Sequence, residues 1–249
     1  MRKVQRYGWR RDLPDARDQR LRPTLAELPE KVDLRPKCPA IYDQGEIGSC
    51  TANAIAAALE FDLIKEGREA FTPSRLFIYY NERAIEGSVG SDSGAQLRDG
   101  CKSVATAGVC PEPQWPYLQN LLFVKPAAVC YREARRDLAR NYFRVPQELF
   151  ALKSCLAAGY PFVFGFTVYD AFESAEVAAS GILNLPAADE SVIGGHAVMA
   201  AGYDDREKRF IVRNSWGMHW GMRGYFTMPY AYLENPELAS DFWTLRRYL

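Results

Sequence analysis

Three side chains that lie far apart in the sequence could together perform nucleophilic chemistry. Cys50 stands in the segment Gly48-Ser49-Cys50-Thr51, directly before an apolar run. His196 follows 146 residues later, and Asn214 comes 18 residues after His196. A thiol, an imidazole and an amide are the parts of a cysteine nucleophile, its general base and the group that orients the base. The chain has two histidines, so His219 is the one rival for the role of base.

Several separated motifs resemble, in their order along the chain, the papain family of cysteine peptidases. The resemblance begins with LPEKVDLR at residues 28–35 and continues through Gln44-Gly45 and Gly48-Ser49-Cys50. The later motifs are Gly195-His196-Ala197-Val198, Asn214-Ser215-Trp216-Gly217 and Gly224-Tyr225. A downstream His and Asn at this spacing from the cysteine is a known signature of that family. The resemblance covers about residues 29–249.

Two positions depart from the family pattern. The family usually has a cysteine shortly before the nucleophile, where this chain has Glu46-Ile47, so the disulfide that such a cysteine forms is absent. An aromatic residue usually follows the nucleophile, where this chain has Thr51. The second change alters the packing beside the thiol and leaves the nucleophile itself in place.

The resemblance implies a role for each residue of the site. Cys50 would attack the scissile carbonyl, and His196 would take the thiol proton and later protonate the leaving amine. Asn214 would orient the imidazole through a hydrogen bond that Trp216 shields from water. Gln44 would donate a side-chain N–H to the developing oxyanion, together with the backbone N–H of Cys50.

We therefore expect a cysteine-type peptidase that cleaves peptide bonds through an acyl-enzyme thioester. Two other functions remain open: an acyl transferase or amide hydrolase that uses the same triad, and a non-catalytic peptide-binding module with a blocked cleft. For single residues the alternatives are a structural core cysteine at Cys50, a turn residue at Asn214 and a solvated loop residue at Gln44. His219 lies between Met218 and Trp220, in a variable part of the motif.

Substrate-binding residues are expected in two parts of the chain. Ser93-Gly94-Ala95 resembles the Gly-rich edge whose backbone pairs with an extended peptide. Gly195, directly before His196, and Trp216, two residues after Asn214, are also expected to bind the substrate. Small side chains would line the main specificity pocket: Ala95, Gly165, Gly194 and Ala197. Such a pocket would accept a bulky apolar side chain, unless a larger residue from elsewhere in the chain fills it.

The elements that must position these residues change in character along the chain. Apolar residues at helical spacing predict helices over residues 51–66, 74–83, 96–107 and 147–158. Apolar and alternating runs predict strands over residues 162–168, 196–201, 210–213, 224–228 and 242–245. Ser49 is the expected N-cap of the first helix. The Cys50 sulfur would then lie at a helix N-terminus, where the dipole favours a thiolate.

A helical half followed by a β-rich half indicates an α+β fold. The resemblance implies a papain-like two-lobed fold with the active-site cleft between the lobes. We expect a helical lobe over about residues 29–140 and a β-rich lobe over about residues 141–249 of a peptidase domain that spans residues 29–249.

Residues 1–28 form a separate N-terminal arm, which resembles the bacterial branch of the family through Tyr7-Gly8-Trp9. The arm has eight Lys or Arg and four Asp or Glu, a net charge of +4, and the remainder carries −4. An insert at residues 170–195 has five acidic residues and no basic ones, and it runs into His196. The insert could be a solvated loop. We expect instead that the arm, a propeptide-like or regulatory segment, covers the cleft in cis, with Tyr7, Trp9 and Leu13 as apolar anchors.

Composition excludes several other classes of protein. A formal net charge of zero gives no electrostatic basis for nucleic-acid binding. The longest strongly apolar stretch, residues 160–169, is too short to span a membrane, so we expect no membrane partner. The basic N-terminus is not followed by an apolar segment, so no secretory signal is visible. This predicts a cytoplasmic or non-classically exported protein whose partner is a peptide or protein substrate.

Five cysteines remain beside Cys50, and we expect most of them to be reduced core residues. A single disulfide among Cys38, Cys110 and Cys130 stays open. No pair has C-x-x-C spacing, so we expect neither a metal site nor a cofactor.

Overall fold

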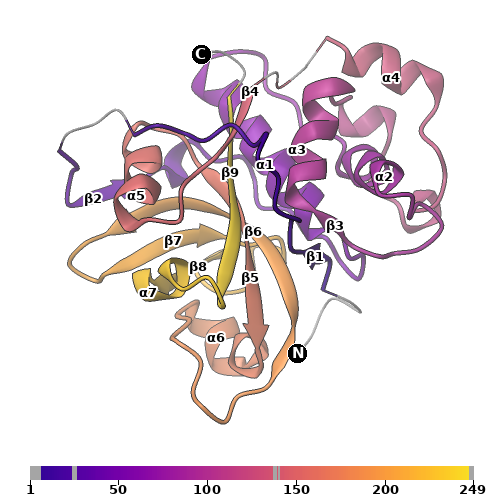
Figure 1. Cartoon of the computed structure of the whole chain (residues 1–249). Coiled ribbons are helices and arrows are strands. Elements are labelled where there is room, and N and C mark those ends of the chain that lie inside the picture. The colour runs from indigo at the N-terminus through magenta and orange to yellow at the C-terminus, as the bar shows by residue number, and fades with distance from the viewer. Residues whose placement is uncertain (1–6, 24–26, 137–138, 140, 247–249) are drawn as a thin grey trace.

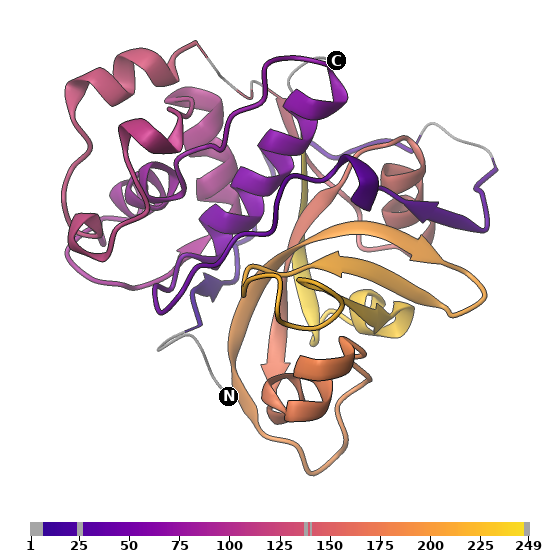
Figure 2. The same ribbon diagram turned by 180° about the vertical axis from the view of Figure 1, so that it is seen from behind.

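The computed structural model describes residues 7–23, 27–136, 139 and 141–246. The helices of the first part of the chain gather on one side of the molecule, and the sheet lies on the other with the short helices of the second part, as Figures 1 and 2 show from opposite directions. The first part of the chain supplies the helices α1 (Cys50–Lys65), α2 (Arg75–Ile85), α3 (Leu97–Thr106) and α4 (Ala128–Ala134). The second part adds α5 (Leu149–Ala157), α6 (Ala175–Ser180) and α7 (Tyr230–Glu234). Short 3-10 turns span Arg35–Lys37, Glu112–Gln114, Gln119–Leu121 and Asp170–Glu173.

The larger sheet is antiparallel and has the strand order β4-β9-β5-β6-β7-β8, with β2 paired to β6. Its strands are β2 (Lys31–Asp33), β4 (Asn141–Arg144), β5 (Phe162–Tyr169), β6 (Val192–Asp204), β7 (Arg209–Arg213), β8 (Tyr225–Pro229) and β9 (Ala239–Arg246). Two further strands, β1 (Trp9–Arg10) and β3 (Ala95–Gln96), form a separate parallel pair. The expected α+β, papain-like fold is confirmed.

Helix α1 lies between the sheet and the other helices. Most of its residues are buried, because alanines at five positions allow α2, α3 and β6 to approach closely: Ala52, Ala54, Ala56, Ala57 and Ala58. Ser49 precedes the helix as expected, but its side chain does not cap a backbone N–H. Its hydroxyl instead lies 2.6 Å from the hydroxyl of Tyr117 and accepts a hydrogen bond from Asn53. Close packing therefore fixes the first turn of α1.

Aromatic side chains fill the core on the far side of the sheet. Phe164 of β5 stacks on Phe242 of β9 with ring centres 5.5 Å apart, and Phe166 of β5 lies 5.8 Å from the imidazole of His196. Each aromatic ring buries a large apolar area with restricted geometry. The core thus gives β6 a rigid base at the point where it carries His196.

The four longer helices and all five predicted strands lie where the sequence places them, with ends that differ by a few residues. The sequence did not predict α4, α6, α7 or the strands β1 to β4, which are short. All six cysteines are free thiols, with five buried and Cys38 half-buried. No helix in the described ranges is both long and apolar enough to cross a membrane.

Candidate active site

The structure joins the predicted imidazole and amide by a hydrogen bond, and it places the predicted thiol at the backbone amide of Ala197, the residue after the imidazole. Cys50 is the first residue of α1, His196 lies on β6, and Asn214 directly follows β7. Nε2 of His196 lies 2.8 Å from Oδ1 of Asn214, and the same oxygen accepts a hydrogen bond from the backbone N–H of Ser215. Because Oδ1 is an acceptor, Nε2 must carry the hydrogen. Nδ1 of the neutral ring is then the bare nitrogen that can accept a proton.

Aromatic rings surround His196 and exclude water from the His196–Asn214 hydrogen bond. Trp216 lies over the imidazole with ring centres 5.2 Å apart, and Phe172 and Phe166 lie 6.1 Å and 5.8 Å away. His196 is 1% exposed. Burial lowers the pKa of His196 to about 4, and the hydrogen bond to Asn214 opposes this shift.

The Cys50 thiol is also fully buried. Burial raises its pKa to about 12, while the backbone amides of Ala197, Gly8 and Thr51 lower it and the charge of Glu82 raises it further. Taken with the lowered pKa of His196, this favours a neutral thiol beside a neutral imidazole at neutral pH. Gly8 belongs to the N-terminal arm, so the arm reaches the sulfur itself.

Gln44 is held by residues from both sides of the cleft. Its Oε1 accepts a hydrogen bond of 2.6 Å from the Ser215 hydroxyl, and its Nε2 donates one of 2.9 Å to the carbonyl of Ile47. The backbone N–H of Gln44 also donates to the carbonyl of Ser215. A carboxamide has two N–H donors, so one is used by Ile47 and the orientation of the group is fixed.

The sequence analysis did not identify Glu82, which lies behind the nucleophile. The Thr51 hydroxyl donates a hydrogen bond of 2.7 Å to Oε2 of Glu82, whose side chain from α2 is 0% exposed. Burial raises the pKa of Glu82 to about 8. Thr51, where the family usually has an aromatic residue, is therefore the donor to a buried carboxyl. The Thr51 hydroxyl next to Cys50 was the signal in the sequence that a buried acceptor lies nearby, but the sequence did not identify Glu82 as that acceptor.

The arm passes through the site. Figures 1 and 2 show it along the junction between the helices and the sheet. The carbonyl of Gly8 accepts a hydrogen bond of 2.7 Å from the backbone N–H of Ala95, and β1 continues this contact alongside β3. A Cβ on Gly8 would lie 1.7 Å from the carbonyl oxygen of Gly48, two residues before Cys50. Only glycine allows the arm to approach the nucleophile this closely.

The rings of Tyr7 and Trp9 occupy the two sides of the site. Trp9 packs on Gly165 and Gly195, where a Cβ would lie 1.9 Å and 2.6 Å from indole atoms. Tyr7 packs on Gly194, with its ring 5.9 Å from the imidazole of His196. Of the small residues predicted to line the specificity pocket, Gly165 lies against Trp9 and Gly194 against Tyr7, so larger residues from the arm occupy this space, which was the alternative that the sequence left open.

The remaining predicted residues have varied surroundings. A Cβ on Gly94, which has a φ of +69°, would lie 2.1 Å from the Gly8 carbonyl oxygen. Ser93 donates a hydrogen bond to the Ser88 hydroxyl, within its own loop. Ala197 is buried beside His196, and Trp216 lies 6.4 Å from the ring of Tyr7. His219 is exposed in a turn.

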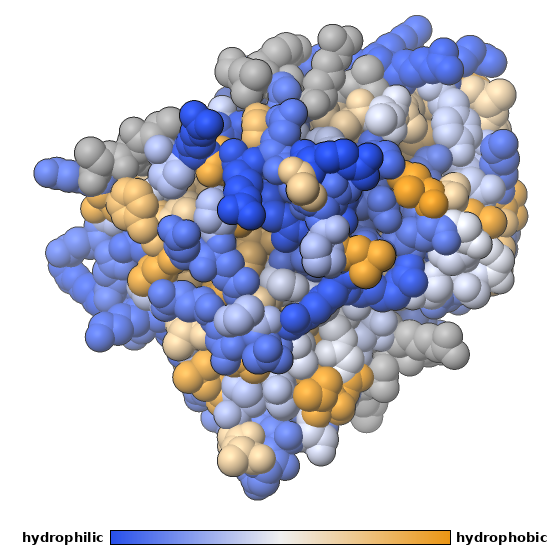
Figure 3. Space-filling model, viewed as in Figure 1, coloured by the Kyte–Doolittle hydropathy of each residue, from blue (hydrophilic) through white to orange (hydrophobic). Residues whose placement is uncertain are grey.

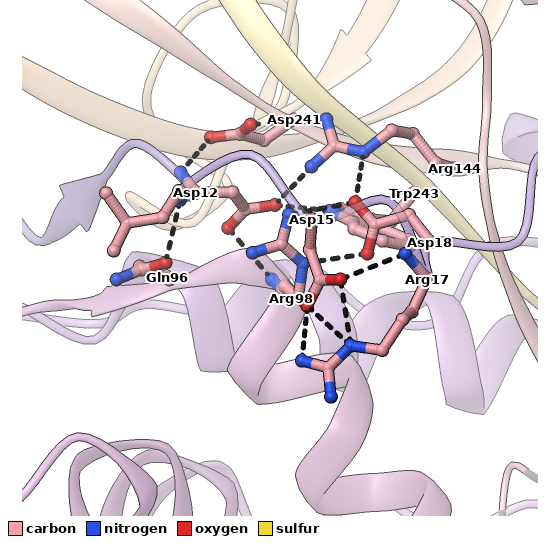
Figure 4. A network of polar contacts seen from close by, with 10 residues as sticks. Asp12, Asp15, Arg17, Asp18, Gln96, Arg98, Arg144, Asp241 and Trp243 are labelled. Carbon is pink, nitrogen blue, oxygen red and sulfur yellow. Dashed lines mark hydrogen bonds and ion pairs between the residues drawn. The ribbon is translucent and has the colours of Figure 1, made fainter.

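After Trp9, the arm is attached to the rest of the protein by two of its carboxylates and not by a third apolar anchor. Leu13 is 70% exposed, so its expected role as an anchor is wrong. Asp12 contacts Arg144 and Trp243, and Asp18 contacts Arg98 and Arg144 (Figure 4). Burial, and then the neighbouring Asp241, raise the pKa of Asp12 to about 6 against these donors.

Polar residues dominate the surface of the face of the molecule that is turned to the viewer in Figures 1 and 3. The expected attraction between a basic arm and the acidic insert has a different form in the structure. The insert contributes Glu173, which accepts a hydrogen bond of 2.5 Å from the Tyr7 hydroxyl. The partly buried ion pairs between the arm and the rest of the protein use the acidic residues Asp12 and Asp18 of the arm instead.

The described residues contain no cluster of three or more His, Cys, Asp or Glu side chains that could hold a metal ion. What the site offers is a thiol, a base of defined tautomer and amide donors. These are the groups of acyl-transfer chemistry.

Comparisons with known proteins agree with this class. The model of the papain family cysteine proteases matches residues 28–242. The crystal structure of xylellain, a cysteine protease from Xylella fastidiosa, superposes with a TM-score of 0.93 at 45% identity and covers 99% of this chain and 98% of that one. An uncharacterized peptidase C1-like protein of Acanthamoeba polyphaga mimivirus is 46% identical over 87% of this chain and 72% of its own length.

The chain belongs to the papain family and is a cysteine-type peptidase. Rat cathepsin S is 28% identical over 81% of this chain, which spans 60% of that protein. Proenzymes share the fold as well, among them procathepsin L 3 of Tenebrio molitor at 19% identity with a TM-score of 0.72, covering 92% of this chain and 74% of that chain.

We predict that the stability of Glu82→Gln relative to the wild type increases as the pH rises. Since the pKa of Glu82 is raised to about 8 in the folded state, the folded state retains a proton that the unfolded state loses near the ordinary glutamate pKa of 4.5. The stability contributed by Glu82 is therefore present below that value and is lost as pH rises through about 8. Gln keeps the acceptor for Thr51 and does not titrate. Thermal melts should show the Tm advantage of the variant growing between about pH 5 and about pH 8. A constant difference across this range would contradict the shift.

Proposed function

We propose that Cys50, His196, Asn214 and Gln44 are the catalytic residues of this peptidase. The observation that carries the proposal is the hydrogen bond from His196 Nε2 to Asn214 Oδ1, which leaves Nδ1 bare. The thiol lies at the N-terminus of a long helix, where the dipole favours an anion. The exposed position of His219 gives it neither an orienting amide nor shelter from water.

The reaction divides into two proton-balanced halves. Nδ1 of His196 accepts the thiol proton, and the Cys50 sulfur attacks the scissile carbonyl carbon. The oxyanion accepts hydrogen bonds from the Cys50 backbone N–H and from the second N–H of Gln44. The intermediate collapses to a thioester, and His196 returns its proton to the leaving amine. Water, deprotonated by His196, then attacks the thioester, and its proton returns to the Cys50 sulfur as the acid leaves.

We further propose that the arm covers the cleft in cis and inhibits the intact chain. Three contacts support this: Gly8 at Gly48 and Cys50, Trp9 in the glycine-lined pocket, and Tyr7 beside His196. Burial of both reactive groups adds a second effect to steric blockage, since desolvation disfavours the thiolate–imidazolium pair. Displacing the arm would rehydrate the site and favour the reactive charge state.

The arm runs opposite to a substrate. The leaving amine takes its proton from His196, so we assign the leaving-group side to the position of Tyr7 and the acyl side to that of Trp9. The acyl side of a peptide is its N-terminal part. The arm runs from Tyr7 to Trp9, from the leaving-group side to the acyl side. No peptide bond of the arm is therefore presented in the orientation that the site cleaves.

We predict that Cys50→Ala abolishes peptide hydrolysis and leaves the melting temperature close to that of the wild type. His196→Ala should be comparably severe because the thiol loses its base, whereas His219→Ala should change kcat by less than about twofold. Turnover of a fluorogenic peptide by the three purified variants measures this. Wild-type turnover in Cys50→Ala would remove the nucleophile assignment, and the reverse ranking of the histidines would transfer the role of base.

Gln44→Ala should lower kcat by about 10²- to 10³-fold, the usual effect of removing one oxyanion donor. KM should change much less, because the interaction forms in the transition state. Steady-state kinetics on the same peptide separates the two parameters. A large rise in KM with unaltered kcat would instead assign Gln44 to substrate binding.

Gly8→Val should open the cleft in the intact chain, because a Cβ at this position would overlap the Gly48 carbonyl. We expect kcat/KM on a short peptide to rise at least about tenfold, which corresponds to about 1.4 kcal/mol of lost arm docking. Gly90→Val is the matched control, since a Cβ on Gly90 meets open space. Equal kcat/KM in Gly8→Val and Gly90→Val would mean that the arm does not inhibit.

A further inference from the structure

The carboxylate of Asp12 lies in a site built by residues outside the N-terminal arm, which are called the body of the protein below. Its Oδ1 accepts a hydrogen bond of 3.1 Å from the backbone N–H of Arg98, in the first turn of α3. Its Oδ2 accepts bonds of 2.8 Å from the indole N–H of Trp243 and 3.0 Å from the Arg144 guanidinium. These donors come from α3, β9 and β4, and Figure 4 shows them converging on one side chain. The Asp12 side chain is 0% exposed.

The charged groups of the body around this site carry a net positive charge, although burial and the neighbouring Asp241 raise the pKa of the Asp12 carboxyl to about 6. Arg98 and Arg144 are the body's cations there, and Asp241, 3.4 Å from Arg144, is its anion. The body therefore presents a net charge of +1, which Asp12 and Asp18 of the arm convert to −1. The Arg144 guanidinium also lies 4.6 Å from the Trp243 ring centre, which restricts its orientation. A planar cation held in this way suits a carboxylate.

Displacement of the arm would leave these donors with water in place of the Asp12 carboxylate. Trp243 is fully buried with the arm in place, and its indole N–H would then exchange a charged acceptor for water, which is the weaker hydrogen-bond partner. The backbone N–H of Arg98 and Nη2 of the Arg144 guanidinium would also lose Asp12 as their acceptor. Any peptide that enters the open cleft and carries a carboxylate at this point would restore all three hydrogen bonds.

We propose that the donors around Asp12 form a subsite for an acidic side chain of the substrate, on the acyl side of the cleft. The inference rests on the proposed function of the arm, which must leave before the subsite can be filled. Asp12 is three residues beyond Trp9, which fills the glycine-lined pocket. A substrate runs the other way, so its acidic residue lies N-terminal to the residue in that pocket. The enzyme therefore prefers peptides with Asp or Glu about three positions before the pocket residue.

The subsite is tested in the full-length Gly8→Val/Asp12→Ala chain, which opens the cleft and removes the internal carboxylate. Paired fluorogenic peptides have Trp in the pocket position and either Asp or Asn two, three or four positions before it. Because hydrogen bonds to a charged group are stronger, we expect kcat/KM to be roughly tenfold higher for the Asp peptide than for the Asn peptide at one or more of these positions. The difference should appear mainly in KM and decrease with added salt.

Two further substitutions in this background remove donors. Trp243→Phe deletes the indole N–H and keeps a ring under Arg144, and Arg144→Lys keeps the charge and loses the bidentate geometry. Each should reduce the preference for Asp, whereas Trp115→Phe, in the helical part of the molecule, should leave it intact. Thermal melts report whether each variant folds, and either folded variant is sufficient for the test.

Equal kcat/KM for Asp and Asn peptides at all three positions would overturn the inference, as would a preference that survives in both donor variants. If the chain cleaved no peptide at all, the proposed function would fail instead. The affinities of the same uncleaved peptides, measured by calorimetry, would then decide the subsite. Tighter binding of the Asp peptide supports it, and equal binding contradicts it.

Discussion

The acceptor oxygen of Asn214 determines the chemistry of the whole cleft. Because it already receives the Ser215 N–H, it can only accept from His196, so the imidazole must carry its hydrogen on Nε2. That choice leaves the opposite nitrogen, Nδ1, able to accept a proton. Ser215 extends the same constraint to Gln44, whose side-chain oxygen accepts the Ser215 hydroxyl. One segment after β7 therefore sets the orientation of both the His196 imidazole and the Gln44 carboxamide.

Glycine makes the internal arm compatible with this site. Gly8 approaches Gly48 on one side, and Gly165 and Gly195 receive the indole of Trp9 on the other. The contacts exclude water from the thiol and the imidazole. Burial raises the pKa of Cys50 and lowers the pKa of His196, and both shifts favour the neutral form. The same backbone edge that would pair with a peptide pairs with the arm, and polar groups further along hold it in register. Inhibition and specificity would thus share one surface.

Much of this could be predicted from the sequence, because local signals were strong where chemistry is concentrated. Cys50, His196 and Asn214 stand in distinctive short motifs, and the longer helices and strands have clear periodicity. The partners of Thr51 and Asp12 could not be predicted, because Glu82, Arg144 and Trp243 reach them only through tertiary packing. Leu13 was expected to be an anchor from its hydrophobicity, yet its neighbour Asp12 has that role. Short elements such as α4 and β4 carry too few residues for a periodic pattern.

The central claim is that the arm keeps Cys50 and His196 neutral by burying them. The most direct test is the rate of Cys50 alkylation by iodoacetamide from about pH 4 to about pH 10, measured by mass spectrometry in the wild type and in Gly8→Val. The account predicts a wild-type thiol that reacts slowly until the solution is alkaline. In the open chain it predicts rapid reaction across the neutral range, where thiolate and imidazolium coexist. Identical pH profiles in the two proteins would contradict it.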